Sequence, residues 1–194
     1  VFETLRKKHK TVCTGYAVLV KDLSYHAGLA SVIIDGYGRT AQANIGGQGI
    51  ANHSWNAIQL NNKWYLCDAT WSSGAMDTEK AMFVRKYDDA YFLADPSLFV
   101  RKHYPLDSSW MLLNKKPTLE MFLNGPLVYS SAFEYGIDRL MPETFNVLVG
   151  KEKTVSFRFT KENNHVIDSV ELQIQENNTT RSVYPEIYQD ANGF

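Results

Sequence analysis

The segment HSWNAIQLNNKWYLCDATW, residues 53–71, most constrains how this chain can fold, because it has the pattern of two strands joined by a two-residue turn. The runs on either side of Asn61-Asn62 are rich in apolar and aromatic residues. Asparagine tolerates the left-handed backbone that a two-residue hairpin turn requires. If Asn61 and Asn62 are the loop residues, Leu60 pairs with Lys63. The sequence therefore predicts an antiparallel hairpin with a fixed register.

This register carries a chemical consequence, because it pairs His53 with Thr70 and Trp55 with Asp68. Side chains alternate between the faces of a strand, so these four residues share one face and Cys67 lies on the other. His53 and Asp68 are then diagonal neighbours, about 7–8 Å apart at the backbone and within side-chain reach. A carboxylate that binds one imidazole nitrogen fixes the tautomer and leaves the other nitrogen available. A three-residue loop would instead place Asp68 on the opposite face.

The segment VCTGYA, residues 12–17, places one of only two cysteines at the start of a predicted helix. Thr11 is the expected cap of this helix and Gly28 its expected end. Apolar residues recur along it at spacings of three and four, which predicts one apolar face. These residues are Cys13, Tyr16, Ala17, Val20, Leu23 and Ala27.

Four roles for Cys13 follow from these surroundings. At a helix N-terminus the unpaired N–H groups favour a thiolate, so Cys13 is a candidate nucleophile and its own N–H a candidate oxyanion donor. It can equally be a buried small apolar residue. A disulfide with Cys67 is disfavoured because Cys67 points away from the predicted His53 face. A zinc site is disfavoured because the sequence has no CxxC or HxxxH spacing, so we expect no metal and no cofactor.

The composition limits the partners of this chain. A net charge of −1 over 194 residues gives no reason to expect a nucleic acid, and no apolar run has the ~18 residues that a transmembrane segment needs. The glycine-rich loop 39–51 lacks the lysine and the helix of a phosphate-binding motif. The chain begins at Val1, so we expect an N-terminally truncated piece. An extracytoplasmic or secreted protein is favoured, with the cytoplasm as the alternative compartment.

The pattern of residues in the sequence changes near Lys116-Pro117, where we place a domain boundary. Residues 1–116 mix helical and strand patterns, which predicts an α+β domain. Residues 117–194 contain short β-rich runs broken by turn residues at intervals of about 8 to 12, a spacing typical of a small antiparallel sandwich. We therefore expect a β-sandwich domain at 117–194, which resembles an immunoglobulin-like domain and is expected to be incomplete.

The combination of VCTGYA, NHSWN and CDATW resembles the transglutaminase-like branch of the papain-like cysteine enzymes. In that branch a cysteine in a GYA-type turn, a histidine in an HxWN-type strand and an aspartate in a DxTW-type strand form the catalytic triad. These positions fall on Cys13, His53 and Asp68. The later segment YFLADPSLFVRKHYPLDSSWMLL is similar to kyphoscoliosis-peptidase-like proteins, in which a β-sandwich follows the core.

The resemblance implies a papain-like core and cysteine-dependent acyl transfer on protein or peptide amides, with a thioester on Cys13. His53 would move the protons and Asp68 would orient His53. Hydrolysis is favoured, since no calcium loop of the D-x-[DN]-x-[DN]-G type is present. A protein-glutamine transglutaminase, or a binding or scaffold protein that keeps the fold, are the alternatives. Tyr16, Trp55 and Trp71 would line the acyl groove if they are not simply core aromatics.

Overall fold

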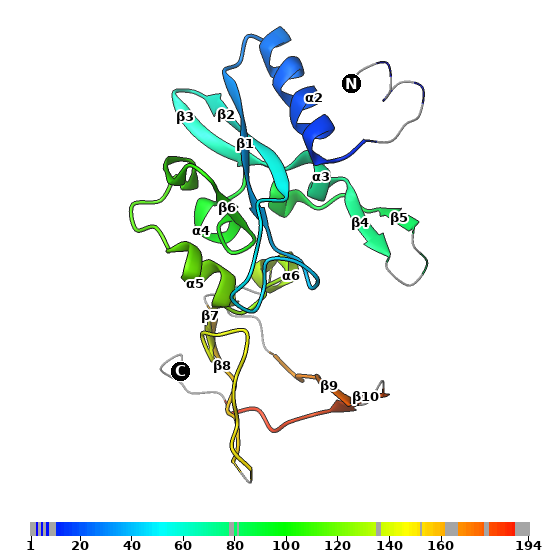
Figure 1. Ribbon diagram of the computed structural model, residues 1–194, viewed down its shortest axis with the longest axis vertical. Helices are drawn as coiled ribbons and strands as arrows, with labels where there is room; N and C mark the ends of the chain where they lie inside the picture. Colours follow the sequence, from blue (N-terminus) through cyan, green and yellow to red (C-terminus); the bar gives the residue numbers. More distant parts are fainter. Residues whose placement is uncertain are drawn as a thin grey trace. The chain divides into compact units, whose positions relative to one another are not determined.

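The computed structural model describes residues 11–77, 80, 82–134, 137–151, 153–161, 167–176 and 179–188, together with Glu3, Leu5 and Lys7. The chain divides into two compact units, one of residues 1–128 with 144–146 and one of residues 129–143 with 147–194. Figure 1 shows their elements. The domain boundary at Lys116-Pro117 stays a prediction.

The first unit is a mixed α+β structure built on a four-stranded antiparallel sheet in the order β3–β2–β1–β6 (Figure 1). Its strands are β1 (Ser31–Gly38), β2 (His53–Leu60), β3 (Lys63–Cys67) and β6 (His103–Pro105). Helix α2 (Cys13–His26) packs against this sheet. The side-chain amide of Asn56 on β2 ties the two together by donating a 3.0 Å hydrogen bond to the carbonyl of Ala17.

The predicted hairpin between β2 and β3 is confirmed. Leu60 pairs with Lys63, and Asn61 and Asn62 both have positive φ angles, 50° and 62°, as a two-residue turn of this hand requires. The ladder ends at the pair Asn56–Cys67, earlier than predicted. The chain then turns into a short helix, so the predicted strand pairings of Thr70 and Asp68 do not form.

Helix α2 begins one residue later than predicted and has a different cap. Its N-cap is Val12, which makes no side-chain hydrogen bond, while Thr11 packs over Gly15, where a Cβ atom would overlap the Thr11 hydroxyl. The end of the helix is as predicted. Gly28 has a φ of 74°, its N–H donates to Tyr25, and the N–H of Leu29 donates to Ser24, the two bonds of a Schellman motif.

The predicted apolar face of α2 is partly wrong. Ala17 is buried and Val20 half-buried, but Leu23 is 58% exposed. Ser24, one residue later, is buried instead. The contact face therefore follows the line Cys13, Ala17, Val20, Ser24, and a serine occupies the position where the sequence pattern favours an apolar residue.

The remaining elements of the first unit are short. They are α3 (Ala69–Ser72), β4 (Gly74–Asp77), β5 (Met82–Arg85), η1 (Asp89–Tyr91), α4 (Pro96–Phe99), η2 (Ser108–Met111) and α5 (Leu119–Asn124). Four of these turns start with an aspartate whose carboxylate accepts hydrogen bonds from free backbone N–H groups, as N-caps do: Asp68, Asp88, Asp95 and Asp107. Aspartate N-caps thus determine where these four short helices after β3 begin.

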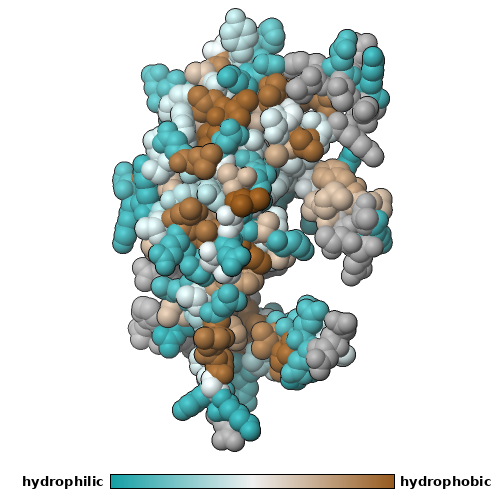
Figure 2. Space-filling model, viewed as in Figure 1, coloured by the Kyte–Doolittle hydropathy of each residue, from teal (hydrophilic) through white to brown (hydrophobic). Residues whose placement is uncertain are grey.

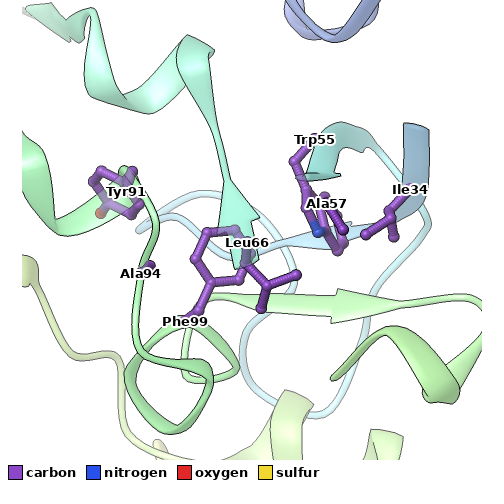
Figure 3. Packing of buried hydrophobic residues seen from close by; sticks show 7 residues of the cluster. All are labelled: Ile34, Trp55, Ala57, Leu66, Tyr91, Ala94 and Phe99. Atoms are coloured by element: carbon purple, nitrogen blue, oxygen red, sulfur yellow. The ribbon is translucent and has the colours of Figure 1, made fainter. Parts of the chain in front are cut away.

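The core of the first unit lies on the face of the sheet that carries the odd-numbered residues of β2. Figure 3 shows how the buried side chains from the strands pack with those from the segment 91–99. They are Ile34, Trp55, Ala57, Leu66, Tyr91, Ala94 and Phe99. The opposite face of β2 carries Asn56, which holds α2. The sheet is therefore covered by α2 on one face and by the later chain on the other.

The described residues of the second unit form α6 (Ser130–Glu134) and four strands in two antiparallel pairs. The strands are β7 (Ile137–Met141), β8 (Arg158–Lys161), β9 (Leu172–Glu176) and β10 (Thr179–Val183). β8 and β9 coincide with parts of predicted β-rich runs, whereas the described run 145–149 is not a strand. The predicted turns at 163–164 and 177–178 lie outside the described residues. A β-sandwich at 117–194 stays a prediction.

None of the helices in the described part of the chain combines the length and the apolar character that a membrane span requires. On the face shown in Figure 2, apolar and hydrophilic residues are interspersed.

Candidate active site

Three side chains from three different elements meet in one hydrogen-bonded cluster. The Nε2 atom of His53 lies 2.7 Å from Oδ2 of Asp68, and the Nε2 atom of His103 lies 3.0 Å from the same oxygen. Asp68 and the side chain of His103 are fully buried, whereas the side chain of His53 is 7% exposed. The predicted contact between His53 and Asp68 is confirmed, and His103 is an additional member that the sequence did not indicate.

The sheet places the two histidines at equivalent points beside the central strand. His53 is the first residue of β2 and pairs with Gly36, and His103 is the first residue of β6 and pairs with Gly38. A Cβ atom on Gly38 would lie 2.9 Å from the Cβ of His53, and one on Gly36 would overlap the carbonyl of Tyr104. Gly38 therefore leaves room for His53 beside it, and Gly36 lets the β6 backbone that carries His103 approach closely.

Asp68 joins the cluster from the N-cap position of α3. Its Oδ1 atom accepts hydrogen bonds from the N–H groups of Thr70 at 2.9 Å and Trp71 at 3.1 Å, while Oδ2 faces the two histidines. Burial raises the pKa of this carboxyl, but the hydrogen bonds from His103 and His53 outweigh burial, and the pKa is held well below its usual range. Asp68 is thus a buried carboxylate that stays ionised.

Aromatic rings enclose this charge. The ring of Trp71 stacks on His53 with centroids 4.8 Å apart, and Phe99 stacks on His103 at 3.9 Å. The ammonium group of Lys102 lies 4.6 Å from the centroid of Trp71, a cation–π contact. Burial lowers the pKa of Lys102, and the nearby carboxylates of Asp88 and Asp68 partly oppose this. The rings fix the imidazole planes and limit the access of water.

Two imidazoles and a carboxylate are also a common ligand set for a transition metal, and the three donor atoms lie within 4.8 Å of one another. Each Nε2 atom is, however, already at hydrogen-bond distance from Oδ2 of Asp68. A metal ion would have to replace both of these hydrogen bonds. We therefore interpret the arrangement as a hydrogen-bonded cluster.

Cys13 does not belong to this cluster, which corrects the expected grouping of Cys13 with His53 and Asp68. It is half-buried as the first residue of α2, and no hydrogen bond joins it to His53 among the described residues. The physical reason is that His53 faces the core side of β2, whereas α2 packs on the side of Asn56. A contact between Cys13 and His53 has to form around the end of the strand, and it stays a prediction.

The other predicted site residues have distinct surroundings. Trp55 is 1% exposed and packs in the core, and Trp71 is half-buried against His53. Tyr16 is half-buried, and its hydroxyl accepts a 3.4 Å hydrogen bond from Ser73. A groove lined by these three residues stays a prediction. Cys67 is free and buried, and burial, followed by the charge of Asp68, raises the pKa of its thiol to about 11.

The glycine-rich loop 39–51 is more tightly held than its composition indicates. Arg39 is 2% exposed, and its guanidinium donates to the carbonyls of Asn44, Gly125 and Pro126. The Asn44 side chain donates to Gly38 and accepts from the N–H of Ile50. The loop is therefore anchored at both ends by buried polar side chains.

Comparison with known proteins gives matches that cover most of this chain. Residues of the chain align with the mouse protein "Kyphoscoliosis peptidase" at 36% identity over 140 residues, 71% of the chain, and with its human counterpart at 35%. The chain is homologous to kyphoscoliosis peptidase. The resemblance to transglutaminase-like proteins is thereby confirmed.

Two further proteins also match the chain. They are hillarin from Drosophila melanogaster, 35% identical over 135 residues, and the "Lim and transglutaminase domain protein ltd-1" from Caenorhabditis elegans, 30% identical over the same length. Both alignments cover 63% of this chain. The chain spans about a fifth of the length of these relatives, 21% of each kyphoscoliosis peptidase and 16–18% of the other two. No protein-family model matches the chain.

Proposed function

We propose that this chain carries the catalytic core of a papain-like, cysteine-dependent acyl-transfer enzyme that hydrolyses protein or peptide amides. The Cys13 thiolate attacks the amide carbonyl carbon, and His53 gives a proton to the leaving nitrogen as the C–N bond breaks. Water then attacks the thioester while His53 takes its proton, which releases a carboxylate and restores the thiolate. Asp68 orients His53 in both steps.

The hydrogen bond between His53 and Asp68 is the observation that carries this proposal. Because Nε2 of His53 is bound to Oδ2 of Asp68, Nδ1 is the nitrogen left to exchange a proton with a nucleophile. The carboxylate is ionised and buried, so it stabilises a positive charge on the imidazole when one forms. This is the arrangement that a general base needs.

The course of α2 supports Cys13 as the nucleophile. The helix ends close to the start of β1, where Ala30 accepts a hydrogen bond from the N–H of Gln59 near the end of β2. Its first residue, Cys13, therefore lies toward the opposite end of the sheet, where β2 begins with His53 (Figure 1). Tyr16 in the first turn contacts Ser73 just after α3.

The first turn of α2 also offers hydrogen-bond donors for an oxyanion. Val12 accepts from the N–H groups of Gly15 and Tyr16, but no acceptor for the N–H of Cys13 is found in the described part of the chain. A donor at the nucleophile itself is well placed for the oxygen of a tetrahedral intermediate. We assign this role to the Cys13 N–H.

Hydrolysis is favoured over cross-linking because the chain is homologous to proteins named as peptidases and because its sequence has no calcium loop of the common type. Protein-glutamine cross-linking is the alternative chemistry, and ltd-1 carries a transglutaminase domain in its name. A scaffold that keeps the fold without turnover is the third reading.

A peptide library read by mass spectrometry separates these functions. The protein is incubated with the library with and without a labelled primary amine, and in calcium or a chelator. We expect cleavage or deamidation without amine incorporation, independent of calcium and lost in Cys13→Ala but kept in Cys67→Ala. Efficient amine incorporation that disappears in Cys13→Ala would show cross-linking instead. No product under any condition would favour the scaffold.

A further inference from the structure

We propose that His103 is a positioning residue of this site, a neutral Nε2–H donor that holds the carboxylate of Asp68 in the orientation that His53 requires. This inference rests on the proposed function. It assigns a role to a buried histidine that neither the triad chemistry nor the comparisons use.

Shared use of one oxygen is the first observation behind this role. His53 and His103 approach Oδ2 of Asp68 at 2.7 and 3.0 Å, while Oδ1 is held by the N–H groups of Thr70 and Trp71. Without His103, the carboxylate would be anchored through Oδ1 alone whenever His53 turns away. With His103, both oxygens have a donor that does not take part in proton transfer.

The surroundings of His103 define its tautomer. Its Nδ1 atom is buried and has no hydrogen-bond partner among the residues that the structure describes. His103 also lines a narrow gap with Trp55, Phe99 and Met111, whose side chains offer the Nδ1 atom no acceptor. A proton on Nδ1 would therefore be a buried donor without an acceptor, which is costly. The proton belongs on Nε2, where Asp68 accepts it.

The enclosure of His103 separates it from the chemistry. It is 1% exposed, and its ring stacks on Phe99 at an interplanar angle of 17°. Among the three cluster members, His53 alone retains exposed side-chain surface. His103 therefore reaches a substrate only through Asp68 and His53, which makes it a positioning residue and not a catalytic one.

Two matched substitutions test the donor. His103→Phe keeps a ring that can stack on Phe99 but removes the N–H, whereas His103→Gln removes the ring but retains an N–H near the Nε2 position. The rate of Cys13 alkylation by iodoacetamide is measured at pH 6.5 in each folded variant. We expect His103→Phe to lose about tenfold to a hundredfold, as supporting hydrogen bonds of a site commonly do, and His103→Gln to stay within about threefold of wild type.

The rates of Cys13 alkylation in the two variants show whether His103 acts through its N–H donor or through the packing of its ring. Equal losses in both variants, a larger loss in His103→Gln, or no loss in either would overturn the role of the N–H. The effect of His53→Ala, measured beside them, tests the proposed function separately. If His53→Ala leaves the Cys13 rate unchanged, the proposed function fails, whatever the His103 variants do.

A second measurement uses the wild-type protein, so it does not depend on whether a variant folds. In protein with ¹⁵N-labelled histidine, two-bond correlations report which imidazole nitrogen carries the proton. At pH 6.5 we expect the Nε2 atom of His103 to carry a proton that is protected from exchange with solvent. We expect its Nδ1 atom to carry no proton. A proton on Nδ1, alone or with one on Nε2, would contradict the proposal directly.

Discussion

Gly38 lies directly against His53, so that a Cβ atom built on the glycine would stand 2.9 Å from the Cβ and 3.0 Å from the Cγ of the histidine. Gly38 also pairs with His103 across the β1–β6 ladder. One backbone position without a side chain thus lies against the imidazole of His53 and pairs with the strand that carries His103.

Gly38→Ala is expected to displace His53 from Asp68, because the new methyl group meets the base of the imidazole and not a flexible chain end. The rate of Cys13 alkylation at pH 6.5 should fall about tenfold or more, as small misplacements of a reacting group can cause. Gly28→Asn is the control, since Gly28 has open space around it and a φ of 74° that asparagine tolerates. Similar rates in Gly38→Ala and wild type would contradict this steric account.

The stability of the protein should depend on pH through His103. Burial lowers the pKa of His103 to about 4 from an ordinary value of 6.5, so between these values the unfolded chain binds a proton that the folded chain does not. The contribution of His103 to the free energy of unfolding is complete above pH 6.5. It is lost as the pH falls toward 4, by roughly 3 kcal/mol. Urea unfolding should show a weaker pH dependence in His103→Phe over this window. An unchanged dependence would mean that His103 is protonated in the folded protein.

The two cysteines should differ sharply in reactivity. Cys67 is buried and the pKa of its thiol is raised to about 11, so little reactive thiolate forms at neutral pH. Cys13 starts helix α2 toward the end of the sheet where β2 begins, and the proposed pairing with His53 supplies a thiolate. At pH 6–7 we expect mass spectrometry after iodoacetamide treatment to find Cys13 modified first, and more slowly in His53→Ala. Equal labelling of both thiols would count against the pairing.

Much of the β2–β3 hairpin, and the contact between His53 and Asp68, could be predicted because both follow from local sequence rules. Two asparagines that accept positive φ set the register, and the register brings Asp68 within reach of His53. The predicted strand nevertheless extends beyond Cys67, where β3 ends. An aspartate followed by Ala-Thr-Trp also caps a helix, and this local preference ends the ladder at Cys67.

His103 could not be predicted, because its partner is 35 residues away and it lies on a three-residue strand. A lone histidine before Tyr-Pro has no spacing pattern that points to Asp68. The anchoring of the loop by Arg39 was missed for a similar reason, since its acceptors are backbone carbonyls 86 and 87 residues away. Every residue has a backbone carbonyl, so a sequence does not indicate which carbonyl will accept a hydrogen bond from a side chain.

Arg39 should control the order of the loop 39–51. Its guanidinium is buried, and burial lowers its pKa to about 10, while it satisfies three carbonyls that would otherwise lack these donors. Arg39→Ala is expected to cost about 3 kcal/mol of unfolding free energy, since each buried group left unpaired costs about 1–3 kcal/mol. Limited proteolysis should then cut near Gly46–Gly49, with Arg101→Ala, a half-buried arginine, as control. A loop equally resistant in both variants would show that other contacts hold it.

The two oxygens of Asp68 belong to two different structures, since Oδ1 caps the four-residue helix α3 and Oδ2 binds the histidines. A helix of one turn has no stability of its own and persists only through its cap and its packing. Each time α3 frays, Oδ1 loses both of its donors, and the carboxylate is then held through Oδ2 alone. The hydrogen exchange rates of the Thr70 and Trp71 amides therefore report how often both oxygens of Asp68 are held at once.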